Sequence, residues 1–221
     1  MLYNPPLFRD AEAQSIRALI EANPLASLVS TSGGEFDVSL LPLLIDEKDG
    51  RLSLIGHFAR ANPHWKRLKD SRRAVALFRG SDFYVSPAWY PSKKVHGKHV
   101  PTWNYELVVA EGTVAVTEDP EALRAIVTRL TERFEPPRAA KGGEVWKISD
   151  APAEYVNAML KAIVGLTLIV EKLEGKRKMS QNREPGDREG VLQGLLAEAV
   201  PETSAYLAAM ASARRHRTED R

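Results

Sequence analysis

The chain has 221 residues and nearly balanced charges, with 31 Lys and Arg against 29 Asp and Glu and a formal net charge of +2. This length suffices for one large domain, or for one domain with a small helical addition, around a sizeable core. The balance excludes a global attraction to nucleic acid or membranes, so such a partner has to meet a local patch. The absence of cysteine excludes disulfides, thiolate metal sites and thiol nucleophiles.

The chain carries no pattern of a secretory leader or of a membrane anchor. Its first residues, Met1 to Pro6, do not place a basic segment before an apolar one. No later apolar run approaches the length that spans a membrane. We therefore expect a soluble cytoplasmic protein with no membrane partner.

The first quarter of the chain predicts one helix and then a meander of three strands. Asp10 can cap the helix, which should end at about Ala22, before Asn23-Pro24. Gly33-Gly34 supplies the first turn of the meander. The strands are expected at residues 25–31, 37–45 and 51–57, with a second turn at 46–50.

The second of these strands contains an unusual apolar run. Residues Leu40 to Ile45 barely alternate between apolar and polar, which predicts burial on both faces of the sheet. Pro42 lies inside the run and cannot donate a hydrogen bond to a neighbouring strand. We therefore expect a bulge or a sheet edge at this position.

The rest of the chain continues the mixture of helices and strands. Asn62-Pro63 can open a short helix, and Asp119-Pro120 is a strong start for a longer amphipathic one. Helices are expected at 64–69, 120–134, 151–161, 188–199 and 202–215, and strands at 74–78, 83–86, 103–116 and 164–173. Many strands with a few helices between them predict an α+β chain built on an antiparallel barrel.

Two aromatic stretches carry the most informative chemistry. Residues 83–90 read FYVSPAWY and residues 100–105 read VPTWNY, with Lys93, Lys94 and Lys98 in a basic loop between them. Indole and phenol rings beside Asn, Thr and Ser, with cations close by, suit a flat heteroaromatic ligand that carries a phosphate. A β-rich core with one exposed basic hairpin is the alternative.

A third polar cluster, KRKMSQNR at residues 176–183, is expected directly after the last strand. Gln and Asn can both donate to and accept from the edge of a planar ring, and Arg can bind a phosphate or carboxylate with two N–H groups. The alternative is a solvated charged loop. The residues alone leave both interpretations open.

Motifs for other chemistry are absent or weak. Four His lie in the middle of the chain, at positions 57, 64, 96 and 99, but their spacing matches no compact zinc motif, so we expect no metal site. The chain has no nucleophile elbow for a Ser-His-Asp hydrolase, no Rossmann fingerprint and no Walker loop. No residue stands out as a catalytic acid or base.

Five segments in a fixed order resemble the PaiB family of FMN-binding negative transcriptional regulators. These segments are Tyr3–Phe8, Gly56–Pro63, Tyr84–Tyr90, Val100–Tyr105 and Lys178–Arg183. The resemblance implies the FMN-binding split barrel, an antiparallel split β-barrel with peripheral helices, over residues 1–183. It leaves residues 184–221 as a C-terminal helical extension that packs on the barrel or the dimer.

The resemblance also implies a homodimer with FMN at the subunit interface, where C-terminal residues of one chain can complete the pocket of the other. Arg60 is the first candidate for the ionic contact to the phosphate, assisted by peptide N–H groups at the start of the following helix. Lys93 meets the family's Lys after the Trp-Tyr pair. The residues expected to bind FMN are Ser39, Leu40, Pro42, His57, Arg60, Asn62, Trp89, Lys93, Thr102, Trp103, Asn104, Tyr105, Lys178, Gln181 and Arg183.

The family name implies repression of transcription, and therefore DNA as a further candidate partner. The last two helices could form a helix-turn-helix or simply pack on the barrel, and the basic loop, Arg72-Arg73 or the cluster at 214–217 could contact phosphates. The alternative function is that of an FMN-dependent oxidoreductase, because split-barrel relatives transfer electrons through FMN. A haem-type ligand on His57 or His96 is a third option.

Overall fold

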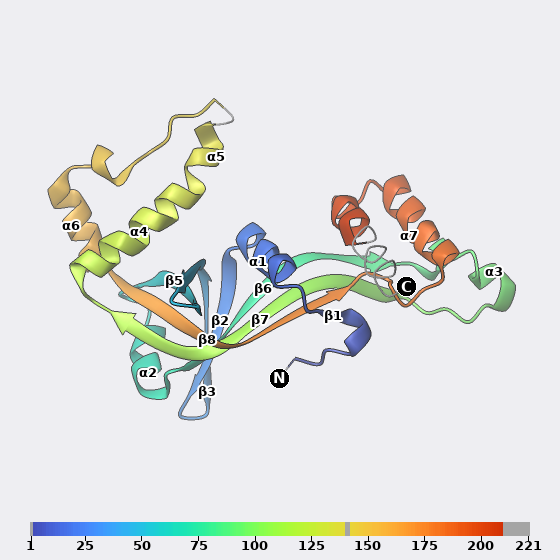
Figure 1. The fold of residues 1–221 in the computed structure, drawn as a ribbon, viewed down its shortest axis with the longest axis horizontal. Coiled ribbons are helices and arrows are strands. Elements are labelled where there is room, and N and C mark those ends of the chain that lie inside the picture. Colours follow the sequence, from blue (N-terminus) through green and yellow to red (C-terminus); the bar gives the residue numbers. More distant parts are fainter. Residues whose placement is uncertain (1, 140–141, 210–221) are drawn as a thin grey trace. The chain divides into compact units, whose positions relative to one another are not determined.

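The structure is a computed structural model that describes residues 2–139 and 142–209. Within these ranges the fold is α+β around one eight-stranded sheet, in the order β3-β2-β6-β7-β8-β5-β4 with β1 added on β8 (Figure 1). The strands are β1 (Arg9–Asp10), β2 (Leu25–Ser32), β3 (Glu35–Pro42), β4 (Leu44–Lys48), β5 (Arg51–Ala59), β6 (Arg73–Val85), β7 (Thr102–Thr117) and β8 (Ile163–Lys178). The helices are α1 (Ala13–Ala22), α2 (His64–Ser71), α3 (Lys93–His96), α4 (Pro120–Phe134), α5 (Pro136–Ala139), α6 (Ala153–Lys161) and α7 (Pro185–Ala197), with short 3-10 turns η1 (Pro6–Phe8), η2 (Pro87–Trp89) and η3 (Ile148–Asp150).

The chain divides into two compact units, each of which is described by itself. Unit 1 comprises Met1–Leu19, Arg79–Val108 and Glu174–Arg221, and unit 2 comprises Ile20–Phe78 and Val109–Leu173. Strands β6, β7 and β8 each have one end in unit 1 and the other end in unit 2. No helix within the described ranges is long and apolar enough to cross a membrane.

In unit 2 the first hairpin of the predicted meander is present, and its turn has the predicted chemistry. The prediction of a three-strand meander is wrong, because β3 and the β4–β5 hairpin lie at opposite ends of the strand order. Gly33 and Gly34 both have positive φ, 59° and 86°, which a tight hairpin turn needs and which glycine adopts without strain. The turn sets the β2–β3 register, in which Ser32 pairs with Glu35 and Leu25 with Pro42. Strand β5 then pairs with β4 on one side and with β8 on the other.

The prediction that residues 40–45 are buried on both faces is wrong. Strand β3 alternates strictly up to Leu41, which is buried, whereas Leu40 is 64% exposed. The strand ends at Pro42, and β4 begins at Leu44. Strand β5 approaches closely at this point, where a Cβ added to Gly56 would lie 2.6 Å from the Pro42 carbonyl oxygen. The expected irregularity at Pro42 is therefore present as a break between two strands.

The helix predicted at Asp119-Pro120 is confirmed together with its cap. The Asp119 carboxylate accepts a 2.8 Å hydrogen bond from the Ala122 backbone N–H, and Pro120 opens α4. Leu123, Ile126 and Leu130 form the buried face. Helix α6 packs beside α4 in unit 2 (Figure 1).

Three predicted strands are present but their predicted bounds are wrong, because the strands continue through polar sequence. Residues 74–78 and 83–86 belong to one strand, β6, in which Gly80 packs against Glu106 at a prospective Cβ distance of 3.0 Å. Strand β8 extends past residue 173 to Lys178, so Lys176 lies in the sheet and not in a loop. Strand β1 pairs with this last part of β8, and Arg9 lies opposite Lys176 in the pairing. A neighbouring strand thus supplies the hydrogen bonds that local sequence does not predict.

Unit 1 has a hydrophobic core of its own. The fully buried members include Tyr90 from the first aromatic stretch, Val191 and Leu195 from α7, and Tyr206. Helix α7 begins at Pro185, three residues before the predicted start, because proline suits the first helical position. The next helix covers 203–209 of the predicted 202–215. The remainder, with the basic cluster at 214–217, lies outside the described residues.

Candidate functional site

In unit 2, two predicted FMN contacts belong to a buried polar network around His64. The Asn62 side chain accepts from the His64 backbone N–H at 3.0 Å and donates to Ser39 Oγ at 2.9 Å. Ser39 Oγ lies 2.8 Å from His64 Nδ1, and Ser30 Oγ lies 2.9 Å from His64 Nε2. Burial lowers the pKa of His64. This network joins β2 and β3 to the start of α2, and the sequence reasoning missed the central role of His64.

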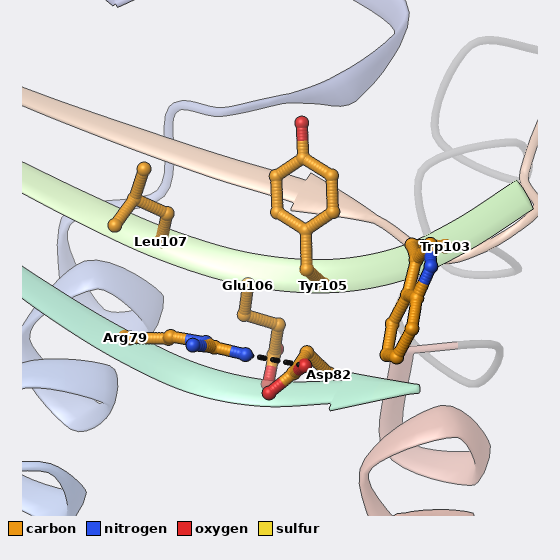
Figure 2. A pocket seen from close by; sticks show the side chains of 6 residues that line it. All are labelled: Arg79, Asp82, Trp103, Tyr105, Glu106 and Leu107. Atoms are coloured by element: carbon orange, nitrogen blue, oxygen red, sulfur yellow. Dashed lines mark hydrogen bonds and ion pairs between the residues drawn. The ribbon is translucent and has the colours of Figure 1, made fainter. Parts of the chain in front are cut away.

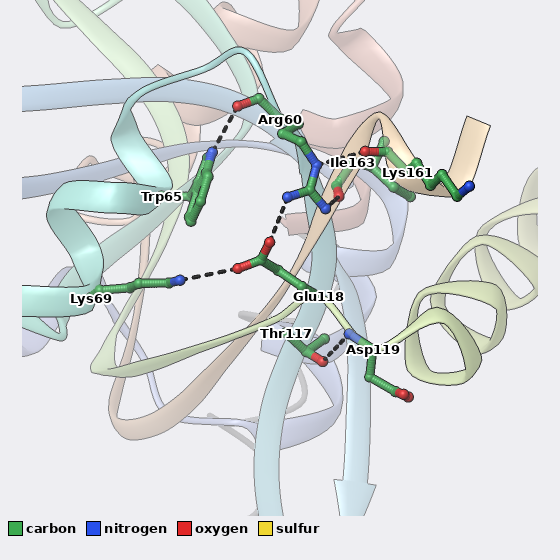
Figure 3. A network of polar contacts seen from close by, with 8 residues as sticks. All are labelled: Arg60, Trp65, Lys69, Thr117, Glu118, Asp119, Lys161 and Ile163. Carbon is green, nitrogen blue, oxygen red and sulfur yellow. Dashed lines mark hydrogen bonds and ion pairs between the residues drawn. The ribbon is translucent and has the colours of Figure 1, made fainter. Parts of the chain in front are cut away.

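Arg60 belongs to a second, more exposed network in unit 2 (Figure 3). Its guanidinium donates from Nε to the Lys161 carbonyl at 2.6 Å and from Nη2 to the Ile163 carbonyl at 3.1 Å, and Nη1 pairs with Glu118 at 2.5 Å. Lys69 pairs with the other oxygen of Glu118 at 3.1 Å. Hydrogen bonds from Arg60 and then Lys69 lower the pKa of the Glu118 carboxyl. Because a guanidinium has five N–H groups, two remain available for a further acceptor.

The other unit 2 candidates do not join these networks. His57 is half-buried on β5, its Nδ1 has no hydrogen-bond partner within the described ranges, and burial lowers its pKa. Leu40 lies on the face of β3 opposite to Ser39, and Pro42 is half-buried at the strand end. Of the six candidates in this unit, the structure therefore brings together Ser39 and Asn62.

In unit 1, Trp103 stands in an open pocket of about 330 Å³ (Figure 2). The pocket is lined by Arg79, Asp82, Trp103, Tyr105, Glu106 and Leu107. The Trp103 side chain is 55% exposed, and its ring packs edge-to-face on Tyr84, with centroids 6.1 Å apart. In Figure 2 the indole hangs beside Asp82, which pairs with Arg79 at 2.5 Å, while the Tyr105 phenol points away from that ion pair.

The sequence reasoning missed the polar residues of this pocket. Arg79 and Asp82 lie in the segment between the strands expected at 74–78 and 83–86. Only the continuation of β6 through this segment places their side chains beside Trp103. Glu106 directly follows the second aromatic stretch and is paired with Arg177 at 2.7 Å. The strand period of two could not have found Glu106, because it places this residue on the face opposite to Trp103 and Tyr105, whereas all three line the pocket.

The third polar cluster holds the start of β7 in place. Lys178 Nζ donates to Thr102 Oγ1 at 2.6 Å and to the Trp103 carbonyl. Burial first, and then Arg183 and Lys176, lower the pKa of Lys178. Gln181 bridges its own turn, because its side chain accepts from the Met179 backbone N–H at 2.6 Å and donates to the Arg177 carbonyl at 2.5 Å.

Arg183 lies in a buried polar cluster at the base of the basic loop. It lies over the Tyr90 ring at 4.9 Å and 3.3 Å from His99 Nδ1. His99 Nε2 lies 2.7 Å from Ser92 Oγ, which donates to Asp187 Oδ2 at 2.6 Å. Burial raises the pKa of Asp187, but hydrogen bonds from Ser92, with His99 and Arg183 nearby, lower it by more.

This cluster contains Ser, His and Asp without forming a catalytic triad. In a triad the carboxylate orients the imidazole nitrogen that faces away from the serine. Here Asp187 accepts directly from Ser92, and the far nitrogen of His99 faces Arg183.

The two remaining candidates in unit 1 lie near this cluster in the chain: Lys93 is exposed on α3, and Trp89 is half-buried in η2. Among the residues that the structure describes, no group of three or more His, Asp or Glu side chains is placed to hold a metal ion.

Solved structures with the same fold are distant in sequence. A conserved hypothetical protein from Mycobacterium tuberculosis aligns with a TM-score of 0.56 at 14% identity, over 83% of this chain and 94% of that one. A "putative 5-nitroimidazole antibiotic resistance protein" from Bacteroides thetaiotaomicron aligns with a TM-score of 0.54 at 15% identity, over 76% of this chain and 85% of that one. These likenesses show the fold and confirm the predicted α+β split barrel.

Relatives found by sequence share a higher percentage of identical residues with this chain than these solved structures do. The "Protease synthase and sporulation protein PAI 2" of Bacillus subtilis is 31% identical over 201 residues, which cover 90% of this chain and 92% of that protein. The profile of a family described as "Putative FMN-binding domain" matches residues 2–172. This match covers most of the residues on which the resemblance to PaiB rests. The chain therefore belongs to the PaiB family of FMN-binding-domain proteins.

Proposed function

We propose that the protein binds FMN and that the isoalloxazine ring lies against Trp103 in the pocket of unit 1. The observation that carries this proposal is the half-exposed Trp103 indole in an open pocket of about 330 Å³. The family's description as a "Putative FMN-binding domain" supports the choice of ligand. An exposed aromatic ring can stack on a flat ligand. Arg79 can donate to the acceptor atoms of the ring edge, and Glu106 can accept from its N–H. When bound, FMN supplies the electron-transfer chemistry, and the protein supplies binding and orientation.

Replacing Trp103 tests this proposal, and Trp146 offers a matched control. Trp146 is 46% exposed but belongs to unit 2 and is not among the residues that line the pocket. Trp103→Leu should weaken FMN about tenfold or more, because stacking on an aromatic side chain contributes roughly 1–3 kcal/mol. Trp146→Leu should bind FMN like the wild type. An absorbance titration measures both, and equal affinities in the two variants would exclude Trp103 as the ring contact.

We propose further that the protein is a homodimer and that a second copy covers the outer face of β3. Phe36, Val38 and Leu40 alternate along this face and are 76%, 65% and 64% exposed. Strand β3 is last in the strand order, and such an apolar edge on a monomer favours association. A two-fold axis would bring the same stripe from each copy together, so that one patch buries itself. Light scattering measures this assembly directly.

We propose that the protein represses transcription and that it contacts DNA through the basic loop, defined as residues 93–99. Its three lysines are exposed and have no carboxylate partner within the described part of the chain. Such a surface contacts phosphates more readily than base edges, so DNA binding should be weakly sequence-specific and sensitive to salt. The helix at 203–209 buries Tyr206 and Ala209, which favours a role in core packing over a role as a DNA-recognition helix. A wild-type protein that retards no DNA would favour the oxidoreductase alternative.

A further inference from the structure

We infer that helix α7, beyond the residues matched by the family profile, positions the Trp103 pocket, and that its close contact with Trp89 seats the helix for this role. Gly190 and Gly194 lie one turn apart on the side of α7 that meets Trp89. A Cβ at Gly194 would lie 2.3 Å from the Trp89 ring, and a Cβ at Gly190 would lie 1.9 Å from the Trp89 carbonyl oxygen. Only glycine therefore permits this approach.

A buried hydrogen-bond cluster fastens the same helix to the residues that follow Trp89. Asp187, in the first turn of α7, accepts from the Ser92 backbone N–H at 3.1 Å and from Ser92 Oγ at 2.6 Å and 2.8 Å. The carboxylate is almost fully buried, so losing Ser92 would leave it unsatisfied. Tyr206 adds a hydrogen bond to the Arg188 carbonyl at 3.0 Å. These hydrogen bonds hold the first turn of α7, directly before the Trp89 contact at Gly190 and Gly194.

The connection to the pocket passes through the strand residue between its two aromatic rings. Asn104 is buried, and its Nδ2 donates to Ser180 Oγ at 2.9 Å. Ser180 has the left-handed φ of 59°, an unusual conformation for a serine, next to Met179. Met179 belongs to the same core as Val191 of α7. Seating α7 therefore fixes the turn that holds Asn104, and Asn104 sets how Trp103 projects from β7.

The inference assigns Trp89 a positioning role in place of the flavin contact that the family resemblance implies. It rests on the proposed function in so far as the pocket holds FMN. The contacts themselves belong to the chain without any ligand. A measurement on the ligand-free protein can therefore test the positioning role separately from flavin binding.

The experiment compares Gly194→Ala with Gly186→Ala in the full chain. Both changes add one methyl group to α7, but a Cβ at Gly186 meets nothing within 4 Å. Hydrogen exchange followed by mass spectrometry should show about tenfold faster exchange at residues 100–106 in Gly194→Ala, equal to about 1.4 kcal/mol of local opening free energy. Residues 51–59 of unit 2 should exchange as in the wild type. Gly186→Ala should match the wild type throughout.

A second variant keeps the test valid if Gly194→Ala does not fold. Asp187→Asn preserves the side-chain volume and removes the charge that Ser92 satisfies, so it should accelerate exchange at residues 100–106 as well. FMN affinity, measured alongside, should fall in the same variants. Wild-type exchange at 100–106 in the folded variants would overturn the inference. A wild-type protein that binds no FMN would instead refute the proposed function, while the exchange comparison still decides the role of α7.

Discussion

The resemblance to the PaiB family implies that Arg60 contacts the FMN phosphate, and two substitutions that should act in opposite directions test this expectation by itself. Arg60 and Lys69 each carry one positive charge and share the single negative charge of Glu118, so the local net charge is +1. Arg60→Ala lowers this local charge to zero, and Glu118→Gln raises it to +2. The first variant should therefore weaken FMN binding, and the second should strengthen it.

The expected loss of FMN affinity follows from how many N–H groups of the Arg60 guanidinium are already engaged. Three of its N–H groups are engaged with the Lys161 and Ile163 carbonyls and with Glu118, which leaves two for a phosphate. A hydrogen bond to a charged group contributes about 1.5–3 kcal/mol, or roughly 10- to 150-fold in affinity. The Arg60 side chain is 38% exposed, so solvent screening favours the lower end. We expect Arg60→Ala to weaken FMN about tenfold.

Riboflavin is the internal control because it has the same ring without the phosphate. Isothermal titration calorimetry with both ligands should show the loss in Arg60→Ala for FMN, with riboflavin little changed. Glu118→Gln should improve FMN relative to riboflavin. Equal losses for the two ligands would mean that Arg60 supports the fold and does not hold the phosphate, since three of its contacts brace the end of β5.

Three further predictions concern assembly, DNA and pH. Val38→Lys should give a monomer by light scattering at micromolar concentration, because the two-fold axis would place two lysines in an apolar contact; a dimer that persists would move the interface elsewhere. Replacing all three lysines of the basic loop by Ser should abolish DNA retardation with FMN still bound, provided that none of them, Lys93 in particular, anchors the FMN phosphate. A partial loss should flatten the salt slope by about 0.9 per lost phosphate contact; unchanged retardation would make the loop irrelevant. Because burial lowers the folded-state pKa of His64 below 6.5, the unfolded chain binds more protons in acid. The stability that neutral His64 contributes is present above pH 6.5 and is lost as pH falls through the lower folded-state value. Urea midpoints should therefore drop as the pH falls below 6.5, and less steeply in His64→Gln.

Several elements of this protein could be predicted from sequence because their causes are local. Asp119 and Pro120 satisfy and preset the first turn of α4 with residues at most three positions apart. Gly33 and Gly34 permit the positive φ values of the β2–β3 turn without help from the rest of the fold. The order of the aromatic and polar segments likewise identifies the family, because it needs no knowledge of contacts.

Other features depended on partners that lie far away in the chain. Local sequence places residues 79–82 between two expected strands and Lys176 after the last one, yet both lie in strands whose hydrogen bonds come from neighbouring strands. Leu40 and Leu41 are the same residue type, and only sheet packing decides that the first is exposed and the second buried. A period-two pattern marks two faces without saying which one meets the core.

The candidate site divides in the same way. Sequence selects aromatic, amide and cationic residues that suit a flavin, and the residue types alone justify that choice. Tertiary structure decides which of these side chains are already engaged: Arg60 with Glu118, Ser39 with His64, and Lys178 with Thr102. The partners lie between 25 and 76 residues apart in the chain. Such pairs form only when the whole fold offsets the entropy of closing the intervening loops, so short-range sequence patterns carry no record of them.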